Sequence, residues 1–351
     1  MAGNSNLHMS KNDKADEFYT QLSLIENELK HYKEYFRGKA VLCNCDDPFE
    51  SNFFKYFAIN FNSLGLKKLM ATCYAGSPIV YTQLTIFGEE EVVAKKKNPK
   101  KPYKIEITEV TDENKDGRVD LADVEYLLKS RKNCLTLLEG DGDFRSPECV
   151  ELLKQADVVV TNPPFSLFRE YMAQLMEHKK DFLVIGNLNA VKYKEILPLF
   201  MTDKIWLGYN SGHYWFKVPD TYKAKKTDFK IDEYGQKWRR MGNICWYTNL
   251  DIKKRHEDMV LFRNYSPEMY PKYDNYDAIE VSRTIDIPYD FYGVIGVPIT
   301  FMTKHNPNQF SIIGVLNSGS GNEYDYAKAI LHGKQLYARI LIQRKRKAHE
   351  D

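Results

Sequence analysis

The sequence lacks several features that would assign the protein to a special class. None of its apolar runs approaches the roughly 18–20 residues that a membrane-spanning helix needs, so we expect no membrane partner. Residues 1–14 are polar and lack the apolar core of a secretory signal peptide. Hydrophobic residues make up 43% of the 351 residues and charged residues 28%, which excludes a disordered or collagen-like chain. We therefore expect a globular protein in the cytoplasm.

Cysteine is also sparse, and its spacing does not suit a metal site. The six cysteines form no CxxC pair, and no cluster of histidines completes a zinc ligand set. Because an export signal is not recognisable, we expect reduced thiols rather than disulfides.

An excess of charge of either sign is missing, but the two signs are segregated along the chain. The net charge is only +2, yet basic residues gather at residues 95–104, 223–240 and 339–347, while acids dominate residues 106–125. Basic clusters can neutralise the phosphates of a nucleic acid, although many are merely solvated surfaces. Charge alone leaves both interpretations open.

Hydrophobic periodicity predicts an α/β fold. Short apolar runs predict buried strands at residues 40–45, 67–73, 134–138, 157–161 and 182–186. Apolar residues at helical spacing predict helices at residues 21–36, 53–64, 147–155 and 166–178. Because these strands and helices alternate, we expect a parallel sheet.

Three other stretches depart from this alternation. Residues 74–133 are charged and mixed in pattern, and we expect them to form an insertion on the surface of the sheet. Residues 205–218 and 244–250 are aromatic-rich strands typical of hairpins. Residues 251–351 are rich in Tyr, Pro and Asn with few helical periods, which predicts a second, loop-rich region.

The strongest chemical signal is the tetrapeptide Asn162-Pro163-Pro164-Phe165, which directly follows the predicted strand 157–161. In open α/β sheets, ligands bind at the carboxyl ends of strands. The side-chain oxygen of Asn162 and the carbonyl of Pro163 can accept hydrogen bonds from an exocyclic amine, and proline holds the backbone there. Phe165 can stack on a flat base. The pattern predicts methylation of an amino group, and the alternative is a plain Pro-Pro turn.

This tetrapeptide is similar to the (D/N/S)PP(Y/F) motif of S-adenosylmethionine-dependent amino-methyltransferases. Other segments resemble one group more closely, the EcoRI-type adenine-specific DNA methyltransferases. They are DEFYT at 16–20, CNCDDP at 43–48, SNFFKYF at 51–57, GDGDFRS at 140–146, the segments 161–170 and 270–278, IWLG at 205–208 and GVPITF at 296–301. The resemblance covers nearly the whole chain, with residues 74–133 as its weakest part.

The resemblance implies a fold, an activity and partners. It implies a Rossmann-like S-adenosylmethionine-dependent methyltransferase sheet with an inserted segment and a loop-rich C-terminal DNA-recognition region. The catalytic domain would span residues 1–250 and the recognition region residues 251–351. The enzyme would methylate N6 of an adenine flipped out of double-stranded DNA, in restriction-modification with a cognate restriction endonuclease, and we expect a monomer. The alternatives are an RNA or protein-glutamine methyltransferase, which shares the NPP motif, and a catalytically inactive DNA-binding methylase fold.

The resemblance also implies residues around the methionine end of the cofactor and around the target base. Phe18, Tyr19 and Thr20 match a segment that closes over the cofactor in related methyltransferases; alternatively, Thr20 is only a helix cap. A flipped adenine needs a second stacking face, which Tyr214 or Trp215 could supply. For these two residues, an aromatic core hairpin is the alternative.

Two further segments match cofactor-binding positions. Asn44, Asp46 and Asp47 follow the first strand, where the family binds the cofactor, although Cys-Asp-Asp replaces the usual glycine-rich loop. Their carboxylates would hold the cofactor's ammonium or would only cap the next helix. Asp143 and Phe144 match the segment that accepts the adenine N6 of the cofactor and stacks on its ring. The acidic ribose ligand expected after the second strand is missing.

Residues 112–123 match the spacing of an EF-hand calcium loop. The candidate oxygen ligands are Asp112, Asn114, Asp116 and Asp123. Position 12 is Asp rather than the longer Glu, and no clear helix precedes the loop. The two interpretations are a structural Ca²⁺ that fixes the insertion against the sheet and an acidic turn that caps the next helix.

Overall fold

The computed structural model divides the chain into two compact units. The first comprises Met1–Gly186 and Gly212–Trp246, and the second comprises Asn187–Ser211 and Tyr247–Asp351. The second unit therefore takes in residues 187–211, which the sequence analysis grouped with the catalytic domain. The structure describes residues 19–45, 47–48, 51–73, 102–112, 115, 117, 119–120, 122–124, 126, 135–218, 228–319 and 323–346.

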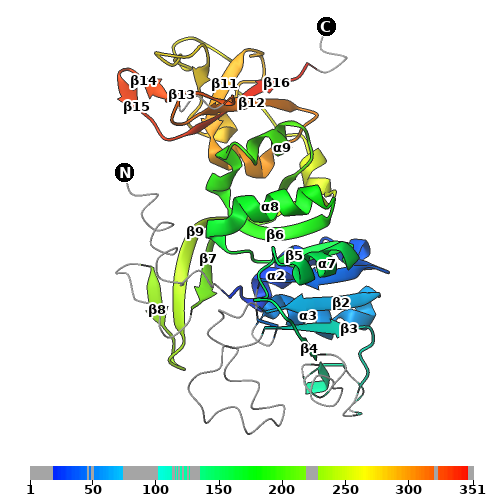
Figure 1. Cartoon of the computed structure of the whole chain (residues 1–351). Helices are drawn as coiled ribbons and strands as arrows, with labels where there is room; N and C mark the ends of the chain where they lie inside the picture. Colours follow the sequence, from blue (N-terminus) through cyan, green and yellow to red (C-terminus); the bar gives the residue numbers. More distant parts are fainter. Residues whose placement is uncertain are drawn as a thin grey trace. The chain divides into compact units, whose positions relative to one another are not determined.

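A large sheet runs in the order β4-β3-β2-β1-β5-β6-β9-β7, with β8 paired to β9 (Figure 1). The strands are β1 Ala40–Cys43, β2 Lys68–Thr72, β3 Tyr103–Ile107, β4 Leu135–Leu137, β5 Val158–Thr161, β6 Asp181–Asn187, β7 Trp206–Lys217, β8 Phe229–Ile231 and β9 Lys237–Thr248. β1 pairs in parallel with both β2 and β5, and β5 pairs in parallel with β6. These pairings confirm the predicted parallel centre of the sheet, and most residues of its strands are apolar and buried.

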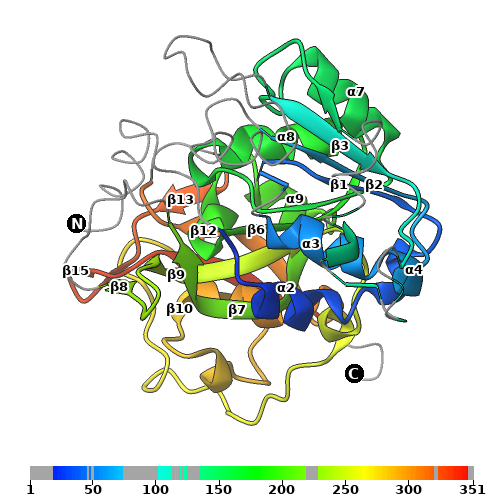
Figure 2. The ribbon, with the colours of Figure 1, turned by 90° about the horizontal axis from the view of Figure 1, so that it is seen from below.

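Strand β3 contradicts the expectation that residues 74–133 lie on the surface of the sheet. It is a member of the sheet and pairs antiparallel with β2 and with β4, as Figures 1 and 2 show for β2 and β3. Its alternate residues Tyr103, Ile105 and Ile107 are buried. The lysines and acids around it concealed this period-two pattern.

Helices cover the sheet of the first unit. They are α2 Leu22–Leu29, α3 Asn52–Ile59, α4 Phe61–Leu64, α7 Pro147–Gln155 and α8 Phe168–Glu177, with 3₁₀ helices η1 Lys33–Phe36 and η2 Phe165–Leu167. α2 lies beside α3 in Figure 2. The prediction of one helix over residues 21–36 is wrong, because the chain turns after Leu29 with 3₁₀-type bonds from His31 N to Glu28 O and from Tyr32 N to Leu29 O.

The second unit contains a five-stranded sheet, which the prediction of a loop-rich region did not include. The sheet order is β10-β11-β16-β12-β13. Its strands are β10 Ile279–Glu280, β11 Val294–Pro298, β12 Phe310–Leu316, β13 Asp325–Ala327 and β16 Arg339–Arg344, with a separate pair β14 Ile330–Leu331 and β15 Lys334–Gln335. Helix α9 Leu197–Met201 and the 3₁₀ helices η3 Leu188–Lys192, η4 Lys253–His256, η5 Thr284–Asp286 and η6 Ile299–Lys304 complete the unit. Leu316 and Leu341 are buried in one apolar cluster on this sheet.

No helix within the described ranges is long and apolar enough to cross a membrane.

Candidate active site

The strand order changes direction at β1, which defines where a ligand site is expected. From β1 the chain moves outward through β2 to β4 and then returns to place β5 on the other side of β1. Ligands of open α/β sheets bind at the carboxyl ends of the strands at such a switch point. Asn44 follows β1 and Asn162 follows β5, so the two predicted segments lie at neighbouring strand ends.

The Asn162–Phe165 segment is buried at its start and more exposed at its end. Asn162 is 6% exposed and Pro163 is buried, whereas Pro164 and Phe165 are half-buried. Leu167 N donates to Pro164 O at 3.0 Å and closes the 3₁₀ turn η2. The segment therefore holds the amide of Asn162 at the strand end and presents the ring of Phe165 beside it.

Aromatic rings of β7 extend this surface. The rings of Phe165 and Phe216 meet edge to face, with centroids 6.4 Å apart and an interplanar angle of 86°. Tyr214 is only 7% exposed and lies 6.4 Å from Phe216, centroid to centroid. Trp215 is half-buried, and Lys230 Nζ lies 4.8 Å from the centre of its ring. Among the described residues of β7, Phe216 is therefore the one whose ring contacts Phe165. The sequence alone did not single out this residue.

Hydrogen bonds join the two strand ends. The hydroxyl of Thr161 donates to Asn44 O, and the hydroxyl of Tyr171, on α8, donates to Asn44 Oδ1. Asn44 is 3% exposed, and Tyr171 is fully buried. Burial raises the pKa of Tyr171 well above its ordinary value, so the hydroxyl stays protonated as a donor. The sequence showed Tyr171 only as part of an apolar helix face, which concealed this role.

The turn after β1 is anchored to β3. Tyr103 hydroxyl donates to Asp47 Oδ1 at 3.0 Å, and both side chains are buried. Burial and the neighbouring Asp47 carboxylate together raise the pKa of Tyr103, so it too remains a hydrogen-bond donor. Asp46, predicted beside it, lies outside the described residues.

The Tyr19–Thr20 segment is held against β7 and α3. Tyr19 and Lys217 exchange two backbone hydrogen bonds of 3.0 and 3.1 Å, and Asn52 Nδ2 donates to Thr20 O at 2.7 Å. The helix α2 has Gln21 at its N-cap position, so Thr20 is not the helix cap. Thr20 Oγ1 is buried and has no hydrogen-bond partner within the described part of the chain. An orphaned buried hydroxyl is costly, and a bound polar group would satisfy it. Phe18 lies outside the described residues.

The Asp143–Phe144 segment lies close to the end of β2. Gly142 has φ +76°, and a Cβ atom there would come within 2.2 Å of Cys73 O, so only glycine permits this approach. Asp143 Oδ1 and Oδ2 accept from Arg145 Nε and Nη2 at 2.8 and 2.7 Å. These hydrogen bonds lower the pKa of Asp143 and keep it ionised.

Tyr171 connects this segment to the first strand end. The Phe144 ring is 6% exposed and meets the Tyr171 ring edge to face at 5.0 Å, while the Tyr171 hydroxyl bonds Asn44. Three of the four predicted segments, around Asn44, Asn162 and Phe144, are therefore joined through Thr161 and Tyr171. Chemically, this arrangement places amide and carbonyl acceptors beside several aromatic rings.

The predicted calcium loop is described only in part. Asp112 Oδ2 accepts from Gly117 N at 2.8 Å, and Asp123 Oδ2 accepts from Asp120 N at 2.9 Å. Asn114 and Asp116 lie outside the described residues. Within the described residues, no group of three or more His, Cys, Asp or Glu side chains could hold a metal ion.

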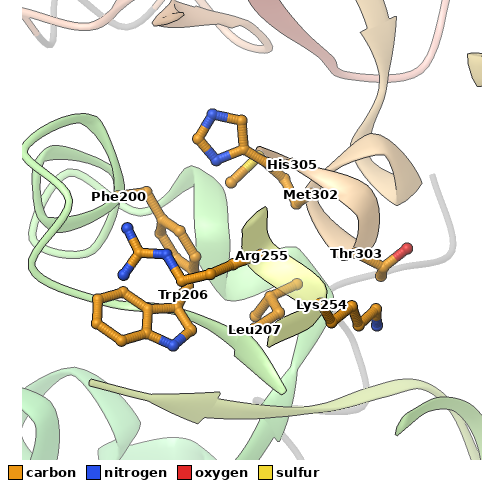
Figure 3. A pocket seen from close by; sticks show the side chains of 8 residues that line it. All are labelled: Phe200, Trp206, Leu207, Lys254, Arg255, Met302, Thr303 and His305. Carbon is orange, nitrogen blue, oxygen red and sulfur yellow. The ribbon is translucent and has the colours of Figure 1, made fainter. Parts of the chain in front are cut away.

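A small pocket in the second unit does not match any predicted site residue. Its walls include Phe200, Trp206, Arg255 and His305 (Figure 3). Arg255 lies over the indole of Trp206 at 3.6 Å, from Cζ to the ring centre. The volume is about 10 Å³, room for about one water molecule and far too little for a cofactor.

Amide and carbonyl acceptors beside aromatic rings, at the carboxyl ends of parallel strands, suit an enzyme that methylates an amino group on a flat substrate. A family model described as "Adenine-specific methyltransferase EcoRI" matches residues 6–347. Type II methyltransferase M.EcoRI of Escherichia coli is 45% identical over 98% of both chains. Type II methyltransferase M.MpnI of Mycoplasma pneumoniae is 34% identical over 96% of this chain and 97% of its own. No solved structure matches the chain.

The chain belongs to the EcoRI family of adenine-specific DNA methyltransferases. It is accordingly an enzyme that uses S-adenosylmethionine to methylate N6 of an adenine extruded from DNA, and its relatives are Type II methyltransferases. The membership removes the alternatives of an RNA or protein-glutamine methyltransferase, and the prediction of an adenine-specific DNA methyltransferase is confirmed.

Proposed function

We propose that Asn162, Pro163, Pro164 and Phe165 form the catalytic surface for the target adenine. Asn162 Oδ1 and Pro163 O accept the two hydrogens of the exocyclic amine, and Pro164 fixes the direction of the chain. Two acceptors draw the nitrogen away from conjugation with the ring, which leaves its lone pair available for attack. S-adenosylmethionine supplies the electrophilic methyl group. The observation that carries this proposal is the position of Asn162 at the switch point beside Asn44.

The flipped base is held between aromatic side chains. Phe165 contributes the first face, and its edge-to-face contact with Phe216 fixes the ring. Trp215 and Tyr214 lie on the same strand as Phe216, and the half-buried Trp215 is the more accessible of the two. Stacking on both faces compensates for the base stacking lost when the adenine leaves the duplex.

The described residues at the strand ends fit the cofactor. The buried hydroxyl of Thr20 and the backbone beside Tyr19 suit its methionine end. Asn44 and Asp47 support the turn after β1, and Asp143 and Phe144 bind the adenine ring of the cofactor. Phe18 and Asp46 belong to the same two predicted segments. No acidic residue follows β2, since Cys73 stands there, and burial raises the pKa of that thiol to about 12.

The remaining parts of the proposal concern architecture and context. Residues 1–250, most of which belong to the first unit, act as the Rossmann-like catalytic domain, because the central strands are parallel and their order in the sheet reverses at β1. Residues 251–351 act as the DNA-recognition region. The enzyme works as a cytoplasmic monomer and protects DNA against a cognate restriction endonuclease.

Sequencing that detects modified bases tests the activity directly. DNA from cells that express the protein is expected to carry N6-methyladenine at one short sequence, and DNA from cells that express Asn162→Ala is the control. Methylation at cytosine, on RNA only, or nowhere would contradict the assignment of the site.

We propose a structural Ca²⁺ at residues 112–123. The bond from Gly117 N to Asp112 Oδ2 forms the tight turn that such a loop needs, and Asp123 is fully buried at its last position. Calorimetric titration of metal-free protein with calcium is expected to release heat at a stoichiometry of one. The double variant Asp112→Ala with Asp116→Ala is the control. Absence of heat at millimolar calcium, or equal heat from the variant, would remove the site.

A further inference from the structure

The second unit contains a cavity of about 300 Å³ whose lining is mainly drawn from residues 263–286. Its volume is in the range of small-molecule sites and leaves room for the edge of a nucleobase. Apolar walls come from Met269, Pro271 and Val281, and the polar side chains at its border include Arg263, Arg283 and Asp286.

Two arginines share one carboxylate at this cavity. Arg283 Nε donates to Asp286 Oδ2 at 2.7 Å, and Arg263 Nε lies 3.5 Å from Asp286 Oδ1. The backbone carbonyl of Asp286 accepts from Tyr270 hydroxyl at 2.8 Å, which fixes the carboxylate-bearing turn η5. The side chains of Arg263 and Arg283 are 46% and 71% exposed.

The charge at the cavity is positive by one unit. Glu280 also lines the cavity, but Arg339 neutralises it through a buried ion pair of 2.8 Å. The two arginines at the border therefore face the single charge of Asp286. An anionic or strongly electron-rich ligand is favoured here.

The direction in which the arginines are held is the decisive feature. Both use Nε toward Asp286, and among the described residues the terminal Nη atoms of Arg263 and Arg283 have no hydrogen-bond partner. A planar pair of Nη donors matches two acceptors side by side, as on the O6 and N7 edge of guanine. The hydrogen bond to Asp286 fixes the direction of the Arg283 guanidinium, as recognition of a base edge requires. The same carboxylate lowers the net positive charge that would attract a phosphate.

We infer that the cavity bordered by Arg263, Arg283 and Asp286 reads the major-groove edge of a guanine in the methylation site. This inference rests on the proposed role of residues 251–351 in DNA recognition. Exposed apolar side chains nearby, Met269 and Ile285, would exclude water from the base edge.

The test replaces the guanine of the DNA and the arginine of the protein, each alone and both in combination. Once the methylated sequence is known, each guanine in it is replaced in turn by 7-deazaguanine, which lacks the N7 acceptor. For the wild-type enzyme, one such replacement is expected to lower kcat/KM about tenfold. Arg283→Gln is expected to lose about tenfold or more on normal DNA and to show no further loss with 7-deazaguanine at that position. Lys272→Gln, an exposed cation paired with Asp277 in the same unit, is the matched control and is expected to keep the wild-type response.

Asp286→Asn separates base reading from phosphate binding. Removing the carboxylate adds net positive charge, so affinity for unrelated DNA is expected to rise while discrimination for the guanine falls. A methylation site without guanine on either strand would overturn the inference. So would additive losses for Arg283→Gln and 7-deazaguanine, or an equal loss by Arg283→Gln on every DNA.

Hydrogen exchange of the wild-type protein bound to its DNA tests the guanine site separately from the proposal that residues 251–351 recognise DNA. Protection at residues 263–286 is expected. Protection elsewhere in residues 251–351, but not there, would overturn the guanine site alone. Absence of protection throughout residues 251–351 would overturn the recognition region as well.

Discussion

Replacing Asn162 by alanine is expected to slow methyl transfer about 100- to 1000-fold while binding of S-adenosylmethionine is retained. The loss corresponds to about 2.7–4 kcal/mol, the usual effect of removing one transition-state hydrogen-bond partner from a water-excluded site. Asn162 is 6% exposed at the end of β5, so water cannot readily replace its oxygen. Single-turnover methylation of cognate DNA measures the rate, and calorimetric titration with S-adenosylmethionine measures cofactor affinity.

Asn162→Asp separates hydrogen bonding from packing. The aspartate keeps the shape and an acceptor oxygen, and related motifs carry Asp at this position, so this variant is expected to retain much more activity than Asn162→Ala. Near-wild-type transfer by Asn162→Ala would contradict the catalytic assignment. A loss of cofactor affinity equal to the loss of rate would show that the residue supports the fold instead.

The centre of the sheet could be predicted because its strands carry their own signal. β1, β2, β5 and β6 are short apolar runs bounded by turns, and a fully buried parallel strand has no other pattern. The break after Leu29 could not be predicted, because Ile25, Leu29, Tyr32 and Phe36 are all fully buried at helical spacing. The spacing of apolar residues indicates which side of the segment is buried. The segment keeps the same side buried when a 3₁₀ turn interrupts the α-helix.

The sheet of the second unit was missed because its pairing is not local. β11 and β12 both pair with β16, which follows β12 only after three short strands, β13, β14 and β15. No hairpin turn in the sequence indicates these strand pairings. The tyrosine, proline and asparagine residues of the connecting loops dominate the composition of this region. β3 was missed for a related reason, since its alternating pattern is only five residues long.

The site shows the same division between local and distant information. Asn44 and Asn162 could be placed from the sequence because each directly follows an apolar strand. Two tyrosines that anchor the turn after β1 come from a helix face and from the unpredicted β3: Tyr171 bonds Asn44, and Tyr103 bonds Asp47. Their hydroxyl groups bond to residues that are far away in the sequence. A single sequence cannot show which buried tyrosine contacts which polar side chain.

The basic run at residues 339–347 is the clearest case where charge in the sequence is misleading. A basic run of this kind suggests phosphate contacts for Arg339, but its side chain is 11% exposed and pairs with Glu280, which is 4% exposed. Arg339 Nη2 lies 2.8 Å from Glu280 Oε1, and Arg339 Nε lies 3.0 Å from Oε2. Arg344 is also engaged, since its Nη1 donates to Tyr292 hydroxyl at 2.6 Å. Arg346 is exposed at the end of the described chain.

Arg339→Met is therefore expected to destabilise the second unit by about 3–5 kcal/mol, because it leaves Glu280 as a buried charge without its cation. The hydroxyl of Tyr273 still donates to Glu280 but cannot neutralise it. Adding Glu280→Gln removes the stranded charge, so the double variant is expected to be more stable than Arg339→Met alone. Hydrogen exchange of the amides in β11 and β16 during urea titration measures the stability of this unit directly.

Arg346→Met is the matched control for the loss of one arginine. It is expected to change the stability by no more than about 0.5 kcal/mol, as surface substitutions usually do. Should Arg346 contact a phosphate, the same variant would flatten the salt dependence of DNA binding by about one unit of slope. A stability loss below about 1 kcal/mol in Arg339→Met would mean that Glu280 finds other compensation, and the ion pair would then not stabilise the sheet as the buried geometry implies.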